Sequence, residues 1–297
     1  MNSPYEDVDP DMQPKVSSHH LRRARRSLLR AQVLLRWRRL SSSGLPVVFG
    51  NAMPKSGSHL LLQILQGFSR IGPFTEAGGE PIRTITADGR RRSPQEIRAD
   101  LEALRPGDSA LGYLWAAPEN LEFLTRPGWA TYFVLRDPRD MLVSHIHYAT
   151  EMYPGHGMHD YYARLPGMDE RLIVAIRGIR EDGANMAGVA ERYARWLGFV
   201  DRPEVLLLHF EDLISKREQM LDEMIDHLDR AGFSPQLGRE EAVRRLGDAI
   251  DPARSPTFRK GLSGEWREHF KEEHKTLFQE CAGDLLVRLG YEEDDSW

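Results

Sequence analysis

The sequence contains a single cysteine, Cys281, among 297 residues. One thiol excludes an intrachain disulfide and fits a reducing compartment, so we expect a cytoplasmic protein. No apolar run approaches the roughly 20 residues that a membrane-spanning helix needs. Arg30 and Arg36 interrupt any apolar core of a signal peptide. With 40% hydrophobic and 29% charged residues, the composition is that of a soluble protein that can form one large domain.

The net charge is −5, and nucleic acid is not expected as a partner. Positive charge is instead concentrated in residues 21–40, which hold eight arginines and no acidic residue, and this leaves about −13 for the rest of the chain. The interspersed Leu, Val and Trp are compatible with a basic amphipathic helix that could lie on an anionic membrane surface. A solvated helix, or one docked on the acidic body, is the alternative. We expect an N-terminal extension over 1–44, disordered at 1–18, before a domain over 45–297.

A loop between a strand and a helix is the most informative segment. The apolar run Val47-Val48-Phe49 is followed by Pro54-Lys-Ser-Gly-Ser58 and then by an apolar helical pattern. Unpaired backbone N–H groups and the helix dipole make such a helix N-terminus suitable for an anion such as phosphate. Lys55 precedes Gly57, which is the wrong order for a Walker A motif. The alternative is an ordinary turn with a solvated lysine.

A second strand, at 130–135, leads into Arg136-Asp-Pro-Arg-Asp-Met-Leu-Val-Ser144. Asp137 is a good helix N-cap and Pro138 suits the first helical turn. Arg136 then lies at the carboxyl end of a strand, where open α/β sheets bind ligands, and Ser144 lies about two turns into the helix. The two side chains could converge on one phosphate. The alternative is a surface cluster of arginine and aspartate.

A third segment, Phe258-Arg-Lys-Gly-Leu-Ser-Gly-Glu-Trp266, combines adjacent cations with glycines and aromatics. Gly261 and Gly264 permit the positive φ values that a loop wrapped around a polyanion often needs. The alternative is a basic turn before a C-terminal helix.

Apolar strand patterns alternate with helical patterns along the body of the chain. This alternation predicts an α/β protein with three layers, in which helices flank a central parallel sheet. Strands are expected at 47–53, 109–115, 130–135 and 204–209, and helices at 57–70, 94–104, 118–125, 138–150, 186–198, 212–231, 238–248 and 271–289. Residues 72–94 and 151–185 are expected to be long loops, the second a candidate lid.

Together the three segments resemble the motifs of the PAPS-dependent sulfotransferases, which transfer a sulfuryl group from 3′-phosphoadenosine 5′-phosphosulfate (PAPS). The resemblance covers roughly 45–290 and implies a fold like that of P-loop NTPases. It implies that Lys55 stabilises the leaving oxygen and that backbone N–H groups of Gly57–His59 hold the 5′-phosphosulfate. The implied residues that bind the co-substrate PAPS are Lys55, Ser56, Gly57, Ser58, His59, Leu60, Arg136, Ser144, Phe210, Arg259, Lys260 and Gly261.

The chain also departs from the family pattern. Leu60 stands where the family has an adenine-stacking tryptophan, and Phe210 lacks the hydroxyl of the family's tyrosine. The family's dimer motif does not match at Lys271-Glu272. Tyr113 stands at the family's histidine base, and a tyrosine is a poor base at neutral pH unless its pKa of about 10 is strongly lowered. The sequence therefore leaves the proton acceptor open.

Candidate bases besides Tyr113 are His59, Glu76, His145 and His147, the last on the helical face of Ser144. The residues taken as catalytic are Lys55, Tyr113, Ser144 and His147. No catalytic metal is expected, although a loose cluster of His145, His147, Glu151, His156 and His159 is an alternative metal site.

The expected function is sulfuryl transfer from PAPS to a hydroxyl acceptor, either a small molecule, a natural product or a lipid-linked alcohol. A catalytically impaired PAPS-binding protein and, with less support, a P-loop kinase are the alternatives. Aromatic and methionine side chains in the two long loops predict an apolar, adaptable acceptor pocket. These side chains are Phe74, Met152, Tyr153, Met158, Tyr161, Tyr162 and Met168.

Overall fold

The computed structural model describes residues 19–76, 80–181, 184–254, 261 and 263–297. Residues 1–18, expected to be disordered, lie outside the described part of the chain. A parallel sheet forms the centre of the molecule, with strand order β2-β4-β1-β5-β8 and with β3 also paired to β4. Its strands are β1 (Val47–Ala52), β2 (Thr75–Glu76), β3 (Ile82–Arg83), β4 (Asp108–Tyr113), β5 (Trp129–Leu135) and β8 (Val205–His209).

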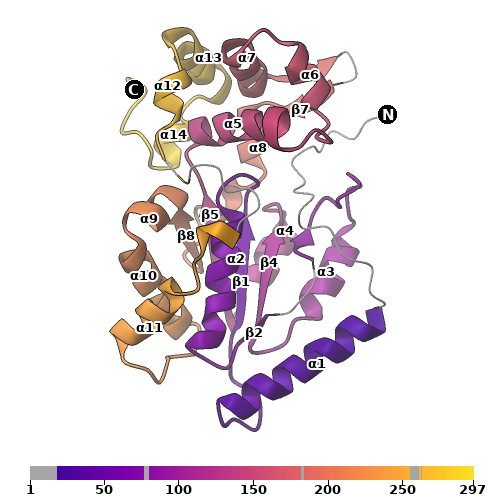
Figure 1. The fold of residues 1–297 in the computed structure, drawn as a ribbon, viewed down its shortest axis with the longest axis vertical. Helices are drawn as coiled ribbons and strands as arrows, with labels where there is room; N and C mark the ends of the chain where they lie inside the picture. Colours follow the sequence, from indigo (N-terminus) through magenta and orange to yellow (C-terminus); the bar gives the residue numbers. More distant parts are fainter. Residues whose placement is uncertain (1–18, 77–79, 182–183, 255–260, 262) are drawn as a thin grey trace.

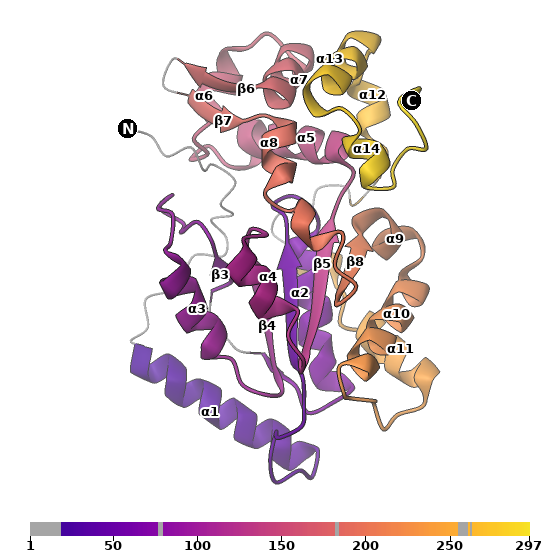
Figure 2. The same ribbon diagram turned by 180° about the vertical axis from the view of Figure 1, so that it is seen from behind.

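Helices cover both faces of this sheet, because successive side chains of a strand point to opposite sides. On β5, the Tyr132 hydroxyl donates to the Met224 carbonyl on one face, whereas the Phe133 ring stacks on Trp196 on the other. Figure 1 shows the first face and Figure 2 the second. The helices of this part are α2 (Ser58–Gly67), α3 (Pro94–Glu102), α4 (Pro118–Leu124), α9 (Phe210–Ser215), α10 (Arg217–Arg230) and α11 (Arg239–Gly247). The predicted three-layer α/β fold is confirmed.

A further layer of helices lies above the carboxyl ends of the strands (Figure 1). Its elements are α5 (Pro138–His147), α6 (His159–Arg164), α7 (Met168–Arg177), α8 (Val189–Ala194), α12 (Trp266–His269), α13 (Glu272–Ala282), α14 (Leu285–Arg288) and the antiparallel hairpin β6 (Gly178–Glu181) and β7 (Ala184–Ala187). The sequence predicted a loop over 151–185, and this prediction was wrong. Three buried side chains of that segment, Leu172, Ala175 and Ile176, instead form the inner face of α7.

Several predicted elements differ in smaller ways from the structure; for example, Met186 and Ala187, predicted to begin a helix, belong to β7. The segment predicted as a loop over 72–94 contributes the short strands β2 and β3. The predicted helix over 138–150 changes at Tyr148 into a π-helical turn, η3 (Tyr148–Met152). The last predicted helix divides at Gly283, whose φ of +53° is in the left-handed region that favours glycine.

The N-terminal helix α1 (His19–Arg36) packs beside β2 at the lower end of the molecule (Figure 1). Arg30 makes a two-point ion pair with the fully buried carboxylate of Asp108, at the start of β4. The expected helix is therefore present, and one side of it is docked on the body. No helix among the described residues combines the length and apolar character that a membrane crossing needs.

Candidate active site

The predicted anion-binding loop connects β1 to α2. Lys55 has a φ of +66° and Gly57 a φ of +93°, so both adopt the left-handed conformation within one tight turn. Ser56 is fully buried, and its hydroxyl has no hydrogen-bond partner among the described residues. Among the described residues, no side-chain hydrogen bond caps α2 at Gly57, and the first N–H groups of a helix have no partner within the helix itself. The turn has the backbone geometry that an anion site requires.

Lys55 extends from this loop toward the helical layer. Its Nζ lies 3.6 Å from the centroid of the Tyr148 ring, in a cation–π contact. Tyr148 is buried and begins the π-helical turn that follows α5. The sequence did not single out Tyr148, although it lies four residues after Ser144 and hence on nearly the same helical face. The contact orients the ammonium group across the edge of the sheet.

Phe210 joins the loop to Arg136. A Cβ atom on Gly57 would lie 2.4 Å from Cδ2 of Phe210, so only glycine permits this approach. The guanidinium carbon of Arg136 lies 4.8 Å from the centroid of the same ring. Residues that follow β1, β5 and β8 therefore meet at the carboxyl edge of the sheet. The sequence predicted such a strand-end position for Arg136.

Arg136 is held by its neighbours. Its carbonyl accepts a hydrogen bond of 2.8 Å from the Tyr193 hydroxyl, and its guanidinium lies 3.7 Å from the Asp140 carboxylate. Asp137 caps α5 as predicted, by accepting from the Arg139 N–H. Ser144 is half-buried on the same helix, two turns away.

The charged residues at the start of α5 are buried, so the surface-cluster alternative is wrong. The Arg139 guanidinium binds the Asp137 and Glu292 carboxylates and lies 3.8 Å from the centroid of the Trp266 ring. Glu211 accepts from the Asp137 N–H and from the Tyr291 hydroxyl. These bonds fix the start of α5 against the C-terminal part of the chain.

Asp140 anchors the third predicted segment to α5. Its carboxylate accepts from the Gly264 N–H at 2.6 Å and from the Trp266 N–H at 2.9 Å. Burial raises the pKa of Asp140, against the opposing effects of Arg136 and the two N–H donors. Gly261 has a φ of +61°, as expected for a loop of this kind. The predicted residues Arg259 and Lys260 lie outside the described residues.

Tyr113 ends the strand next to the one that leads to Lys55. Gly112 of β4 is in register with Asn51 of β1, and the Asn51 side chain bonds both backbone groups of Leu114. The Tyr113 ring is buried, and the guanidinium carbon of Arg83 lies 4.8 Å from its centroid. Arg83, from β3, is a buried cation that the sequence gave no reason to select.

The remaining predicted residues differ in their surroundings. His59 and Leu60 are half-buried in the first turn of α2, and Ser58 is buried. The Nδ1 atom of His147 lies 2.8 Å from a Glu151 carboxylate oxygen. The alternative five-residue metal cluster is not formed, because the His145 and His156 rings pack in the interior and the His159 ring contacts the Ala149 carbonyl.

The predicted acceptor side chains divide into two groups. Phe74, Met158 and Tyr162 are fully buried in the core and do not line an accessible pocket, so the prediction was wrong for them. Phe74, for example, packs edge-on against both Phe68 and Phe233. The other predicted side chains are at least partly exposed: Met152, Tyr153, Tyr161 and Met168.

Comparison with known proteins identifies the family. The family model of the sulfotransferase domain matches residues 131–290, more than half of the chain. This match includes Arg136, Ser144 and the segment 259–266, and it begins after the Lys55 loop. No curated protein sequence matches the chain.

The fold is also that of a solved structure, the crystal structure of mouse sulfotransferase SULT7A1 complexed with PAP. The TM-score is 0.57 at 16% sequence identity, over 84% of this chain and 88% of the mouse chain. An identity this low establishes the fold alone, which is the P-loop NTPase-like fold of sulfotransferases. The family match and the shared fold agree, and the chain therefore belongs to the sulfotransferase family of sulfuryl-transferring enzymes.

Proposed function

We propose that this enzyme transfers the sulfuryl group of PAPS to the hydroxyl group of a small molecule, a natural product or a lipid-linked alcohol. The observation that carries the proposal is the meeting of Gly57, Phe210 and Arg136 at the carboxyl edge of the sheet. At this edge, three segments that are far apart in the sequence supply a helix N-terminus and an arginine whose position is fixed by its neighbours. The solved relative with this fold was crystallised with PAP, the desulfated product of PAPS.

The donor side of the site has a role for each predicted residue. Lys55, with the N–H groups of residues 57–59 and the hydroxyls of Ser56 and Ser58, binds the 5′-phosphosulfate. Arg136 and Ser144 bind the 3′-phosphate, together with Arg259, Lys260 and Gly261. The Leu60 and Phe210 side chains contact the adenine. Anion-binding groups act strongly when they are already oriented before the ligand arrives, as Arg136 is by Tyr193 and Asp140.

The proposed reaction is a displacement at sulfur accompanied by a proton transfer. The acceptor oxygen attacks sulfur, the bond from sulfur to the 5′-phosphate oxygen breaks, and the acceptor proton leaves to a base. Lys55 stabilises the negative charge that develops on the leaving phosphate oxygen. The candidates for the group that receives the proton are Tyr113, His147, His59, Glu76 and His145, of which Tyr113 and His147 are the two taken as catalytic.

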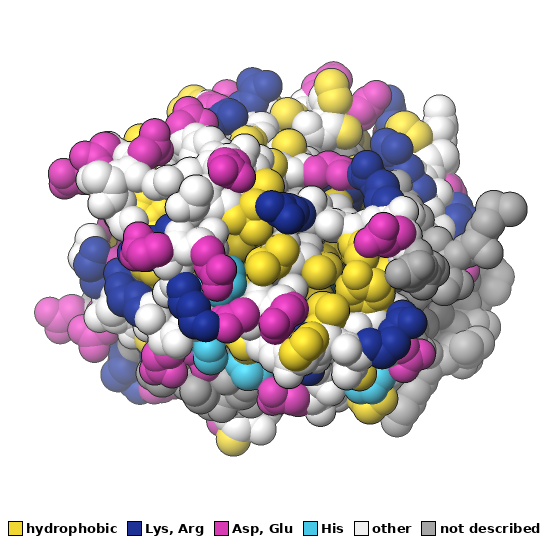
Figure 3. Space-filling model, turned by 90° about the horizontal axis from the view of Figure 1, so that it is seen from above, with side chains coloured by type: hydrophobic (Ala, Val, Ile, Leu, Met, Phe, Trp, Pro, Cys, Tyr) yellow, Lys and Arg dark blue, Asp and Glu magenta, His cyan; other side chains and the backbone are white. Residues whose placement is uncertain are grey.

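The acceptor is proposed to be largely apolar. The exposed and half-buried side chains of Met152, Tyr153, Tyr161 and Met168 lie in the helical layer above the strand ends. Viewed from above, hydrophobic side chains of that layer gather between acidic and basic ones (Figure 3). A surface of mixed charge suits a neutral phenol or alcohol better than a highly charged polysaccharide.

The proposal is tested first by calorimetric titration with 3′,5′-ADP at low salt. The second test is turnover: extracts are incubated with labelled PAPS, and a product heavier by SO₃ is sought.

Lys55→Met should lower kcat by about 100- to 1,000-fold, because it removes the positive charge that stabilises the leaving phosphate oxygen. Lys216→Met is the control, since Lys216 is an exposed lysine paired with Asp212. Failure to bind 3′,5′-ADP contradicts the proposal. Binding without turnover favours the impaired PAPS-binding protein. Family membership removes the kinase alternative.

We further propose that the outer side of α1 contacts an anionic membrane surface. Leu28 and Leu35 are 60% and 80% exposed on that side, and Arg36, Arg38 and Arg39 are exposed nearby. Exposed leucines flanked by arginines favour the interface of anionic lipids. The protein should float with vesicles that contain 30% phosphatidylserine and not with neutral vesicles. Flotation that is unchanged in the Leu28→Gln, Leu35→Gln double variant would contradict this contact.

A further inference from the structure

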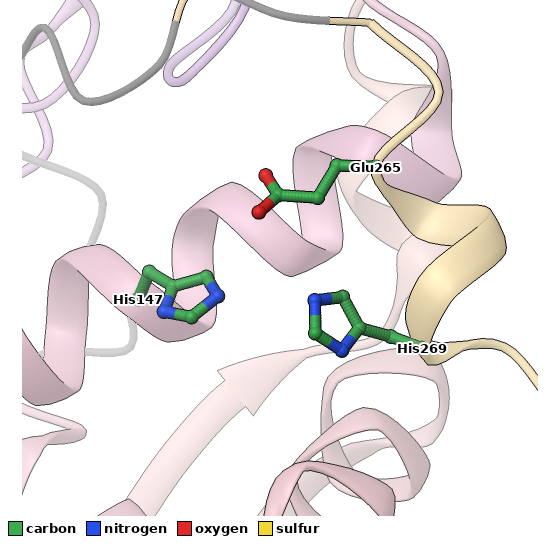
Figure 4. A group of neighbouring side chains, drawn as sticks. All are labelled: His147, Glu265 and His269. Atoms are coloured by element: carbon green, nitrogen blue, oxygen red, sulfur yellow. The ribbon is translucent and has the colours of Figure 1, made fainter.

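Two histidines and one glutamate meet beside the junction of α5 and α12 (Figure 4). His147 is the last residue of α5, Glu265 immediately precedes α12, and His269 is the last residue of α12. One possible ligand atom from each of the three side chains lies within 4.8 Å of those of the other two. More than 100 residues separate His147 from the other two, so only the fold brings them together.

The two ring nitrogens of His147 are in different surroundings. Nδ1 lies 2.8 Å from the Glu151 carboxylate. Nε2 is buried and has no hydrogen-bond partner among the described residues. In metal sites, a ligating histidine almost always donates its other N–H to a carboxylate or carbonyl, which fixes the ring and makes the ligating nitrogen more basic. The pair of Glu151 and His147 has this arrangement.

Glu265 supplies the anionic ligand. Its side chain is buried, whereas those of His147 and His269 are partly exposed. Two imidazoles and one carboxylate, with a fourth position left for water, form a ligand set that zinc and other first-row divalent metals accept.

We propose that Nε2 of His147, a carboxylate oxygen of Glu265 and one ring nitrogen of His269 bind a divalent transition-metal ion, with zinc the best match. In a tetrahedral zinc site, ligand atoms about 2.0–2.2 Å from the ion lie about 3.4 Å apart. The three side chains therefore need to draw together by at most about 1.4 Å. Side-chain rotations supply a shift of this size without movement of either helix.

The ion would join α5 to α12. The Asp140 carboxylate already binds Gly264 and Trp266 to the first part of α5, and the metal adds a second connection at its end. A metal on Nε2 occupies the atom that a general base would use, which leaves Tyr113 as the candidate on the acceptor side. The proposed metal binding requires only the side chains of His147, Glu265 and His269, and it does not depend on which sulfuryl donor the enzyme uses.

The test is binding of Zn²⁺ to metal-free protein, measured by calorimetry, with Co²⁺ absorption as a report of the ligand geometry. We expect one ion per chain, a visible Co²⁺ spectrum typical of tetrahedral coordination, and a melting temperature that rises with added Zn²⁺. His147→Gln and Glu265→Gln should each lose the Co²⁺ spectrum. Glu268→Gln, which changes an exposed glutamate of α12, should keep it.

A second variant separates a lost ligand from a lost fold. Glu151 is largely exposed, so Glu151→Gln should fold normally and weaken Zn²⁺ affinity by about 10- to 100-fold. Circular dichroism of each metal-free variant checks its fold. Absence of Zn²⁺ binding at micromolar concentrations, or equal binding by the wild type and Glu265→Gln, overturns the proposal.

Discussion

Lys55 and Gly57 show how much of the site depends on single residues. Both have positive φ within one turn, and a non-glycine residue such as Lys55 adopts that conformation at a cost of about 1–2 kcal/mol. Backbone strain of this kind persists where contacts with surrounding residues stabilise it, and it often marks a functional loop. At Lys55, the ammonium group contacts the ring of Tyr148.

Gly57→Ala is predicted to cost more than its backbone angle alone would suggest. The new Cβ would lie 2.4 Å from Phe210, so we expect a loss of about 2–4 kcal/mol in unfolding free energy and loss of 3′,5′-ADP binding. Gly232→Ala is the matched control, because Gly232 has a φ of +104° but nothing within 4 Å of a Cβ, and it should lose only about 1 kcal/mol. Urea denaturation measures the unfolding free energy of both variants. Equal losses in the two variants would show that the clash with Phe210 does not contribute to the cost of Gly57→Ala.

Tyr113→His tests which group receives the acceptor proton. If the site lacks only its base, an imidazole at the end of β4 should raise kcat by about 10-fold or more near neutral pH. Tyr113→Phe is the control, since it keeps a ring for the Arg83 contact and cannot take a proton. Single-turnover rates with an identified acceptor give the comparison. A rate in the histidine variant at or below that of the wild type would show that the proton leaves by another route.

At the scale of elements, His227 of α10 packs against the sheet and makes the stability of the protein depend on pH. The His227 ring packs edge-on against Tyr132 of β5, 5.2 Å between centroids. Burial, with a smaller effect of Arg230, lowers the pKa of His227 from 6.5 to about 4. The unfolded chain therefore binds a proton between these pH values while the folded protein does not, so stability is lost as the pH falls from 6.5 to about 4.

His227→Phe should remove most of this acid sensitivity. Between pH 7.5 and pH 5, the wild type should lose about 2 kcal/mol through His227, and the variant should lose that much less. The comparison uses urea denaturation of both proteins at both pH values, so that any constant effect of the substitution cancels. If both proteins lose the same free energy over this range, His227 is not the sensitive group.

At the scale of the whole molecule, an ion pair between Arg30 and Asp108 joins α1 to the body of the protein. The Arg30 Nε lies 2.8 Å from the Asp108 carboxylate, which is fully buried and also accepts from the Arg105 N–H. Removing one partner of a buried pair leaves the other charge without compensation, which costs more than the pair itself contributes. The basic segment is thus both a docked part of the body and, on its outer side, the proposed contact with lipid.

Arg30→Gln should lower the unfolding free energy by about 2–4 kcal/mol and make α1 more accessible to proteases. Arg36→Gln is the control, because Arg36 is exposed on the same helix and its loss should cost less than about 0.5 kcal/mol. Limited proteolysis and urea denaturation report the two effects. Equal stability of the two variants would show that the ion pair does not hold the helix.

The amino-acid sequence alone determined the features that depend on near neighbours along the chain. These include the turn from β1 into α2, the Asp137–Pro138 start of α5 and the alternation of strands and helices, since caps, turns and periodicity act over a few residues. The tertiary structure decided what depends on the path of the chain. It turned a predicted loop into α6, α7 and a hairpin, and it brought Tyr148 to Lys55. It also brought Glu265 and His269 to His147, because contacts between distant segments follow from how the helices pack and leave no local pattern in the sequence.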